Sequence, residues 1–571
     1  MQVGGLIPSI LTFLHKRGEV IRVDEKEMKN FWKSGDPFIW LTGGAFIFSL
    51  LMIAGLLFLI MAKGLGFFWP SDIAQVTLKD GSMLLGQIRG REEIPQPGAP
   101  VGTPDLHRIQ LQIGNRDLYG LDFRWIDEEK IKSIDYPKDA VLFERREWGN
   151  MYGFIKEVTV DGKVVARGDK DSWAALNNHL PESQKIYKEI KRIEKKDIGD
   201  INYEMESLRL KMRKIELKGD ISNPSIQAEI KSIEDKIEDQ KKLYQAKEDE
   251  LSKLYEKLNK DKVFITTVDG REKEMSLGGI VRAYKPNAMN WFKKAGLYSS
   301  KLWEFVSGDP RESNTEGGIF PAIFGTVMMV FIMSIAVLPF GVLAALYLRE
   351  YAKQGLLVTI VRICVNNLAG VPSIVFGVFG LGFFIYAIGG TIDQLFYPEA
   401  LPNPTYGTGG IIWASLTLAL LTMPVVIVAT EEGLAAVPRN IKEGSLALGA
   451  TKFETVWRVV IPSAMPAILT GLILAIARAT GEVAPLMITG VVKLAPALPI
   501  DGHFPFIHLE RKFMHLGFHI YDVGFQSPNV EAAKPMVYAT TLLLILIVVV
   551  LNLAAIIIRN RLRKRYVYSA F

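Results

Sequence analysis

Residues Glu443 to Pro462 read EGSLALGATKFETVWRVVIP, a polar, amphipathic stretch between two apolar runs of membrane length. Leu446 and Ala450 fall four residues apart, on one face of a helix, and Gly449 is suited to end or bend that helix. The pattern predicts a short helix, a glycine break and a second helix that starts before the closing proline. Such a shape fits a groove on a partner protein, although a helix on an ordinary interfacial loop would show the same pattern.

Six apolar runs reach the length of about 20 residues that a bilayer core requires. The 571-residue chain is therefore expected to be a mainly α-helical membrane protein. No small-residue cleavage site precedes Lys63, so the first run is expected to remain as an anchor. The runs lie near 38–62, 319–348, 364–390, 410–430, 466–492 and 536–558.

The distribution of Lys and Arg predicts the orientation of these runs. Short connections rich in these residues are expected in the cytoplasm, and they occur at 349–353, at 439–458 and after 559. The connection 391–409 has no Lys or Arg. Both termini are therefore predicted to be cytoplasmic, with 1–37 as a leader, 559–571 as a tail and 63–318 exported. The net charge of +6 is spread over these separate parts, which argues against nucleic-acid binding.

The exported segment is predicted to be a β-domain that carries a helical arm. Alternating apolar and polar residues flank four turn dipeptides, a strong signal for β-hairpins, at Asp80-Gly81, Gly114-Asn115, Asp161-Gly162 and Asp269-Gly270. Between the third and fourth hairpins, about 182–260, apolar residues keep heptad spacing on both sides of a Gly/Pro turn near 219–224. This predicts an antiparallel coiled-coil hairpin of roughly 50 Å at ~1.5 Å per residue. A spacer and a partner-binding arm both fit the pattern.

The strongest chemical signal is Arg478 with Glu482, in the fifth apolar run. Counted from Pro466, Arg478 lies roughly 18 Å into the helix, near mid-bilayer, and the two residues share a helical face. An Arg at this depth costs on the order of 3 kcal/mol, so it either pairs for packing or lines a pathway. As a pathway residue, Arg478 offers forked donors to a tetrahedral oxyanion, while Glu482 neutralises it between passages. Thr480 and Ser373 are further candidate hydroxyl donors.

The quoted stretch also resembles a known signature. Glu443, Gly449, Ile461 and Pro462 fall on the spacing E-x5-G-x11-I-P, which resembles the cytoplasmic ATPase-docking loop of binding-protein-dependent ABC importer permeases. Gly-Ser follows the glutamate where the family has two alanines. Together with LAGVPSIVFG at 368–377 and RATGE at 478–482, the loop is similar to PstA-type phosphate permeases, over about 319–571. The large exported segment departs from that family.

The resemblance implies the type I ABC importer permease fold, with a permease core over 319–558 and a docking loop over 431–465. It implies import of inorganic phosphate across a bacterial inner membrane, beside membrane lipid, with no cofactor or metal. The implied partners are a homologous second permease, a pair of ATPase subunits and a periplasmic phosphate-binding protein. The chain is not expected to be an enzyme, because GSLALGATK has Ala450 where a P-loop requires Lys. Two alternatives stay open: a permease for sulfate or molybdate, and a membrane-tethered sensor or scaffold that acts through the arm.

Overall fold

The structure is a computed structural model that describes residues 33–96, 105–219, 223–527 and 530–567. The predicted leader lies almost wholly outside the described residues. The chain divides into two compact units, residues 1–63 and 64–571. The described part of the first unit consists mainly of α3 (Asp36–Gly66), an apolar helix of 31 residues that covers the predicted first span.

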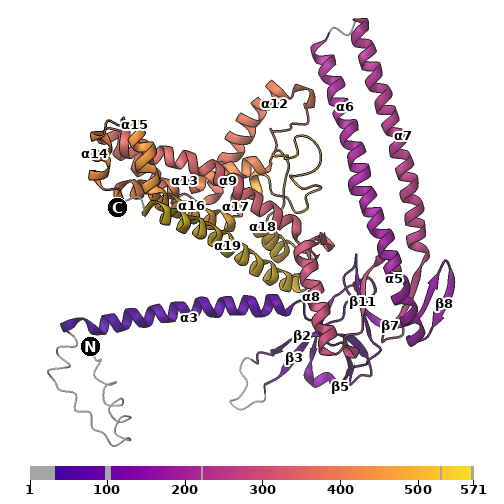
Figure 1. Cartoon of the computed structure of the whole chain (residues 1–571). Helices are drawn as coiled ribbons and strands as arrows, with labels where there is room; N and C mark the ends of the chain where they lie inside the picture. The colour runs from indigo at the N-terminus through magenta and orange to yellow at the C-terminus, as the bar shows by residue number, and fades with distance from the viewer. Residues whose placement is uncertain (1–32, 97–104, 220–222, 528–529, 568–571) are drawn as a thin grey trace, which may run out of the picture. The chain divides into compact units, whose positions relative to one another are not determined.

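The β-domain contains two antiparallel sheets with a helical arm inserted in the second (Figure 1). The first sheet has the order β4-β3-β2-β1-β5. The second has the order β10-β9-β7-β6-β11, with β8 paired to β7. The strands of the first sheet are β1 (Ala74–Leu78), β2 (Met83–Glu93), β3 (His107–Gln112), β4 (Phe123–Asp127) and β5 (Ile131–Asp135). Those of the second are β6 (Val141–Arg145), β7 (Met151–Val160), β8 (Lys163–Arg167), β9 (Lys262–Thr266), β10 (Glu272–Ser276) and β11 (Ile280–Tyr284).

The four predicted hairpins are confirmed. The strand pairs β1/β2, β3/β4, β7/β8 and β9/β10 are antiparallel and enclose the four turn dipeptides. At the third turn Asp161 and Gly162 have φ of +50° and +76°, the left-handed pair that a two-residue hairpin turn requires. The second hairpin also holds a short helix, α4 (Arg116–Tyr119), between its strands.

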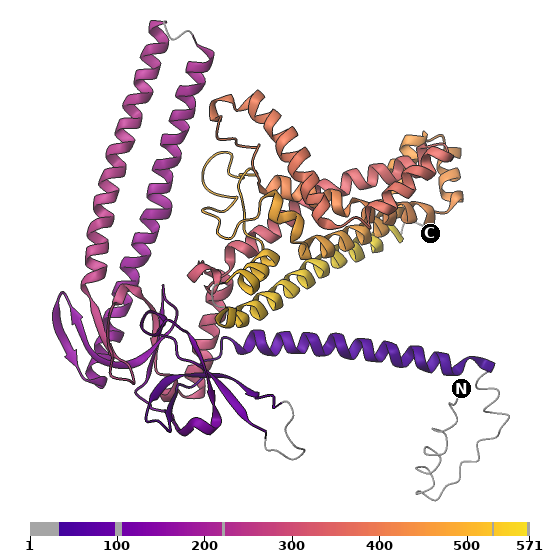
Figure 2. The same ribbon diagram turned by 180° about the vertical axis from the view of Figure 1, so that it is seen from behind.

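The helical arm lies between the third and fourth hairpins, as predicted. Its first limb joins α5 (Asp169–Arg192), a π-helical turn over 193–197 and α6 (Ile198–Lys218), and so begins upstream of 182. Its second limb is α7 (Pro224–Lys260), which packs along α6 (Figure 2). Ile233, Ile237 and Leu258, three of the predicted heptad positions, are buried. The helical hairpin is confirmed, and its supercoiling as a coiled coil stays a prediction.

Six helices among the described residues are long and apolar enough to cross a membrane. Besides α3 they are Phe320–Tyr351, Ser373–Phe396, Ile411–Ala436, Lys452–Gly481 and Val530–Lys564. The bundle is built from α9 (Phe320–Leu346), α11 (Ser373–Phe379), α12 (Gly390–Phe396), α13 (Ile411–Ala436), α16 (Ile461–Gly481) and α19 (Val530–Val567). The helix α13 is central, since it packs against both α9 and α16, and α16 packs in turn against α19.

The third span begins later than the sequence predicts. Residues 364–368, expected at its start, end a separate short helix, α10 (Leu356–Leu368), and the span starts at Ser373. Pro372 is the N-cap of α11, and because proline disfavours a helical preceding residue, the helix breaks here. Cys364 is exposed on α10.

The fifth span begins earlier than the sequence predicts. The helix α15 (Lys452–Thr455), a π-helical turn over 456–460 and α16 form one continuous helix, which ends at Gly481. Ile461, the residue before Pro462, is helical, with φ −61° and ψ −48°. A π-helical turn re-satisfies backbone groups that a proline leaves free, so the helix continues through Pro462.

Candidate functional site

The predicted charged pair lies where the fifth span ends. Arg478 is in the last turn of α16, and Glu482 follows the helix in an extended conformation. The Arg478 Nε and Glu482 Oε1 atoms are 3.7 Å apart, and both side chains are partly exposed. The two residues form an ion pair, although Glu482 lies beyond the helix and not on its face. The helix break therefore presents the guanidinium at a helix end.

The position of Arg478 along its helix depends on where that helix starts. The sequence argument counts from Pro466, whereas the continuous helix begins at Lys452. At ~1.5 Å per residue, Arg478 lies about 39 Å from that start. It is therefore close to the end of this continuous helix opposite the quoted loop.

The two candidate hydroxyl donors differ in position. Thr480 is fully buried, and its hydroxyl donates to the carbonyl of Ile476 at 2.7 Å, so it is engaged within α16. Ser373 is partly buried at the start of α11. The next helix after the pair, α17 (Ala484–Thr489), packs parallel to α11, because Gly377 lies against Pro485 and Gly380 against Thr489. Both helices thus start at the same level, which places Ser373 toward the end of α17 that follows Glu482.

Arg362, on α10, is the next arginine near the third span, and it is bound to α13. Its Nε lies 3.2 Å from a carboxylate oxygen of Glu431, and its Nη1 donates to Gln354 at 3.0 Å. These contacts tie α10 to α13. Arg362 therefore fastens the helices together, and the structure does not join it to Arg478.

The quoted loop has the predicted form of two helices around a glycine. α14 (Arg439–Ala447) ends in a Schellman motif: the Gly449 N–H donates to the Leu446 carbonyl at 2.9 Å, and the Ala450 N–H to Ser445 at 3.3 Å. Gly449 has φ +89°, the left-handed conformation that glycine adopts most easily. No heavy atom lies within 4 Å of the position its Cβ would take. The glycine is therefore required by backbone conformation and not by lack of space.

The second helix of the loop begins with a capping box. The Glu454 N–H donates to the Thr451 hydroxyl at 3.2 Å, and the Thr451 N–H donates to the Glu454 carboxylate at 2.9 Å. These bonds satisfy two backbone donors at the helix start. The Ser445 and Thr455 hydroxyls, 3.0 Å apart, join the two short helices across the turn. The loop is thus a preformed unit of two helices.

The end of the second span holds the loop in place through a residue that sequence reasoning missed. The Glu350 carboxylate pairs with Lys442, and its carbonyl accepts from Lys452 Nζ at 2.6 Å. The same ammonium lies 4.8 Å from the ring centroid of Tyr351. The sequence did hold a signal for this pairing. Glu350 comes directly after an apolar span, and the next basic connection contains two lysines.

The loop exposes large apolar side chains to solvent. Leu448 is 91% exposed and Phe453 65% exposed, and Trp457 stacks on Phe453 with ring centroids 6.3 Å apart. Glu443 is exposed on α14. Of the other signature residues, Ile461 packs against the buried cluster that joins α13 to α16, and Pro462 is built into the continuous helix. Exposed apolar patches of this kind mark protein interaction sites.

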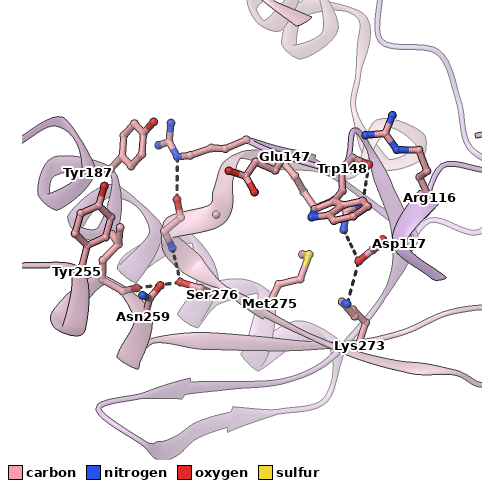
Figure 3. Close-up of a pocket in the computed structure, with 15 residues that line it drawn as sticks. Arg116, Asp117, Glu147, Trp148, Tyr187, Tyr255, Asn259, Lys273, Met275 and Ser276 are labelled. Atoms are coloured by element: carbon pink, nitrogen blue, oxygen red, sulfur yellow. Dashed lines mark hydrogen bonds and ion pairs between the residues drawn. The ribbon is translucent and has the colours of Figure 1, made fainter. Parts of the chain in front are cut away.

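A cavity of about 750 Å³ opens in the β-domain beside the base of the arm (Figure 3). The Asp117 carboxylate lies 3.0 Å from both Arg145 and Lys273. Burial alone raises the pKa of Asp117, but the two cations outweigh burial and hold its pKa below the ordinary value. Arg146 lies over the ring of Tyr187, on the arm, at 3.2 Å. The cations that line this cavity are therefore mostly bound by residues of the domain itself. The contact of Arg146 with Tyr187 joins the arm to the sheet.

The arm also contacts two loops of the bundle. Lys214 on α6 pairs with Glu399, in the connection between α12 and α13, at 2.9 Å. The Tyr203 hydroxyl donates to the carbonyl of Phe504, between α17 and α18 (Leu516–Tyr521), at 2.8 Å. The arm is therefore linked to the connections that follow the third and fifth spans.

Comparison with known proteins identifies the membrane part of the chain. A family model described as the binding-protein-dependent transport system inner membrane component matches residues 337–568. The probable ABC transporter permease protein YqgI of Bacillus subtilis (strain 168) is 32% identical over 241 residues, which cover 41% of this chain and 76% of that protein. The phosphate transport system permease protein PstA 1 of Mycobacterium tuberculosis (strain ATCC 25618 / H37Rv) is 34% identical over 201 residues, which cover 35% of this chain and 58% of that protein.

Among solved structures, an inward-facing conformation of the MetNI methionine ABC transporter is 19% identical, with a TM-score of 0.32, over 46% of this chain and 98% of that one. A structural similarity at this level carries no argument beyond the sequence relatives. The match to YqgI covers more than two thirds of that permease, and the six apolar helices agree with a multi-pass membrane protein. The chain belongs to the family of binding-protein-dependent transport system inner membrane components, as a permease subunit of an ABC importer without an ATPase site of its own.

Proposed function

We propose that this chain is the permease subunit of an ATP-driven importer of inorganic phosphate. The observation that carries the proposal is the position of Arg478, whose partly exposed guanidinium lies at the end of α16 with one carboxylate 3.7 Å away. A guanidinium presents forked donors that match two oxygens of a tetrahedral oxyanion, and a single nearby carboxylate leaves donors free. Relatives that are named phosphate transport system permeases support phosphate as the anion.

The surroundings of Arg478 favour an anion. The third span starts at Ser373, so the positive end of its helix dipole lies toward the level of Glu482. Unpaired N–H groups at the start of a helix, a serine hydroxyl and a guanidinium are each donors that suit an anion. Interrupted helices near the substrate are typical of membrane transporters.

The loop supplies the coupling to ATP hydrolysis. We infer that residues 443–462 dock on one of a pair of ATPase subunits, with Glu443 as a polar contact and the exposed Leu448 and Phe453 as apolar contacts. A homologous second permease completes the bundle, and a periplasmic phosphate-binding protein delivers the anion on the opposite side. In this arrangement both termini are cytoplasmic, in the inner membrane, and the β-domain with its arm is periplasmic.

Uptake of radiolabelled phosphate tests this function in cells that lack the chain. Wild type should restore uptake, and Arg478→Ala should abolish it while the protein still inserts and assembles. Arg478→Lys, which keeps the charge but loses the fork, should retain only a small part of the uptake. The matched control is Arg561→Ala, at an exposed position of α19, which should transport normally.

Sulfate uptake in the same cells tests the specificity. Rescue of sulfate in place of phosphate would contradict the assignment of phosphate and favour another oxyanion. Normal phosphate uptake by Arg478→Ala would show that the ion pair with Glu482 serves packing alone. Each outcome is read against the amount of chain in the membrane, so loss of protein is distinguished from loss of transport.

A scaffold function for the arm is the second candidate, favoured by the contacts of Lys214 with Glu399 and of Tyr203 with Phe504. If the chain acts as a sensor through the arm, removal of 182–260 abolishes the function and Glu443→Lys leaves it intact. If it acts as a permease, Glu443→Lys abolishes uptake. The two variants therefore separate the two functions.

A further inference from the structure

The helix α8 (Trp291–Ser307), which joins the β-domain to the bundle, carries an exposed aromatic stripe. Phe292 is 78% exposed and Trp303 is 73% exposed, and Val306 also faces outward. With Gly296 and Ser299, these residues recur every three or four positions, so they share one face of the helix. Two such aromatic rings on one exposed helical face mark a contact surface.

The opposite face of α8 packs against the ends of the spans. Phe305 is buried in a cluster with Ile319, just before α9, and Met536, near the start of α19. The Ile319 N–H also donates to the Phe305 carbonyl at 2.9 Å. The helix α8 is therefore fixed at the end of the bundle where the second span begins.

Residues that follow the first apolar run contact the same face. The Phe68 and Phe305 rings are 5.0 Å apart, and the Trp69 and Tyr298 rings are 5.8 Å apart. Phe68 and Trp69 come directly after α3 ends at Gly66. Residues just after the first apolar run and residues just before the second therefore both lie against α8. This places α8 at the level where apolar spans end.

We propose that α8 lies in the interface of the bilayer and that its aromatic stripe binds the boundary between lipid headgroups and acyl chains. Figures 1 and 2 show α8 running across the direction of α9 and α19 instead of continuing it. Trp and other aromatic rings are enriched at this depth of a membrane, and helices with one apolar face lie in its plane. Lys293, exposed beside Phe292, fits the phosphates of the headgroups.

Such a contact fixes the β-domain to the membrane surface. Lys301 of α8 pairs with Glu144 of β6, and Lys294 pairs with Asp72 at 2.6 Å. Leu297 packs against the buried cluster that contains Tyr152 and Tyr284 of the sheet. One face of α8 is therefore bound to the β-domain and the bundle, and the other is left for lipid.

Spin labelling of the full chain in lipid nanodiscs tests the proposal. Cys364 is the single cysteine, so Cys364→Ser gives a background for single labels. Nitroxides are attached through Trp303→Cys, Phe292→Cys and Ser299→Cys, and through Tyr136→Cys as the control. Tyr136 is an aromatic residue of the β-domain that is 55% exposed and lies outside α8 in the sequence. The ratio of relaxation by oxygen, which partitions into lipid, to relaxation by a water-soluble nickel chelate should be severalfold higher on α8 than at Tyr136.

Two results would overturn the proposal. A ratio on α8 equal to that at Tyr136 would place the stripe in water. Low accessibility to both reagents would mean that protein, such as a second copy of the chain, covers it. The Ser299→Cys label keeps both aromatic residues in place, so the measurement remains decisive even if Trp303→Cys does not fold.

Discussion

The replacement Gly449→Ala isolates the backbone geometry of the predicted docking loop. Gly449 has φ +89°, and no heavy atom lies within 4 Å of the position a Cβ would occupy. An alanine therefore meets no steric clash with the rest of the protein. The whole effect comes from placing an L-residue in the left-handed region. Gly444, five residues earlier within α14, also has nothing within 4 Å of its Cβ position and has ordinary helical geometry.

The magnitude follows from these two conformations. An L-residue in the left-handed helical region costs about 1–2 kcal/mol. The reduced freedom of the unfolded chain offsets ~0.4–1 kcal/mol of this. A net cost of about 1 kcal/mol raises the population of the opened loop about fivefold. In contrast, Gly444→Ala replaces glycine within a helix and should stabilise α14 by up to about 1 kcal/mol.

Hydrogen exchange of the Ala450 amide reads this population directly, because that N–H donates to the Ser445 carbonyl only when the loop is closed. We expect exchange about fivefold faster in Gly449→Ala and unchanged or slower in Gly444→Ala. Gly449→Asn should lie between wild type and Gly449→Ala, since asparagine tolerates the left-handed region. Phosphate uptake should fall in the same order if the closed loop is the form that docks.

Equal exchange in the two alanine variants would refute the argument, because it would show that the conformation of Gly449 does not limit loop closure. Faster exchange with normal uptake would support the effect of the Gly449 conformation on loop closure. It would also show that loop closure does not limit transport. Loss of uptake in Gly444→Ala would also count against the reasoning, since that variant leaves the turn unchanged.

Three further predictions follow from single contacts. Phe453→Asp should leave thermal unfolding within about 0.5 kcal/mol of wild type, because the ring is exposed, yet abolish co-purification with the ATPase subunits; retained binding would contradict the docking surface. Burial raises the pKa of Glu316 to about 7 from an ordinary 4.5, so this carboxyl stays protonated to a higher pH in the folded state than in the unfolded state. The free energy of unfolding therefore falls as the pH rises between these two values. Glu316→Gln should therefore stabilise the folded state above pH 7, on the order of 2 kcal/mol, with little change at pH 4, and an equal gain at both pH values would contradict this cause. Gly377→Val should destabilise the bundle by about 1–3 kcal/mol in thermal unfolding, since a Cβ would lie 2.8 Å from Pro485 Cα, and an unchanged midpoint would refute the close packing of α11 on α17.

Local patterns account for the parts of the fold that were predictable. The turns at Asp80-Gly81 and Asp161-Gly162 and the heptad positions of the arm depend on residues near one another in sequence, so their hairpins and helices follow from the chain. The helix break at Gly449 is of the same kind. The order of strands in the two sheets depends on contacts across the domain, for which the sequence alone held no signal.

The composition of the candidate site was predictable, but the start of the helix that carries it was not. Arg478 and Glu482 do form a pair, as their types and spacing predict. The start of their helix differs from the prediction because Pro466 suggests a helix start, whereas the helix begins at Lys452 and continues through a π-helical turn and both prolines. Thr480 was counted as a free donor because its bond to the backbone of its own helix cannot be read from spacing. Glu350 was missed since its partners lie about a hundred residues away.

The continuous fifth span connects the loop and the charged pair mechanically. One helix of 30 residues runs from Lys452, inside the loop, to Gly481, next to Arg478. A helix of this length extends about 45 Å, and it moves as a unit wherever its hydrogen bonds are regular. The π-helical turn over 456–460 lies at the loop end of this helix, so a displacement at the turn moves α16 as a whole. If the ATPase subunits move the loop as proposed, the guanidinium of Arg478 moves with it, and no chain of intermediate contacts is needed to carry the motion across the membrane.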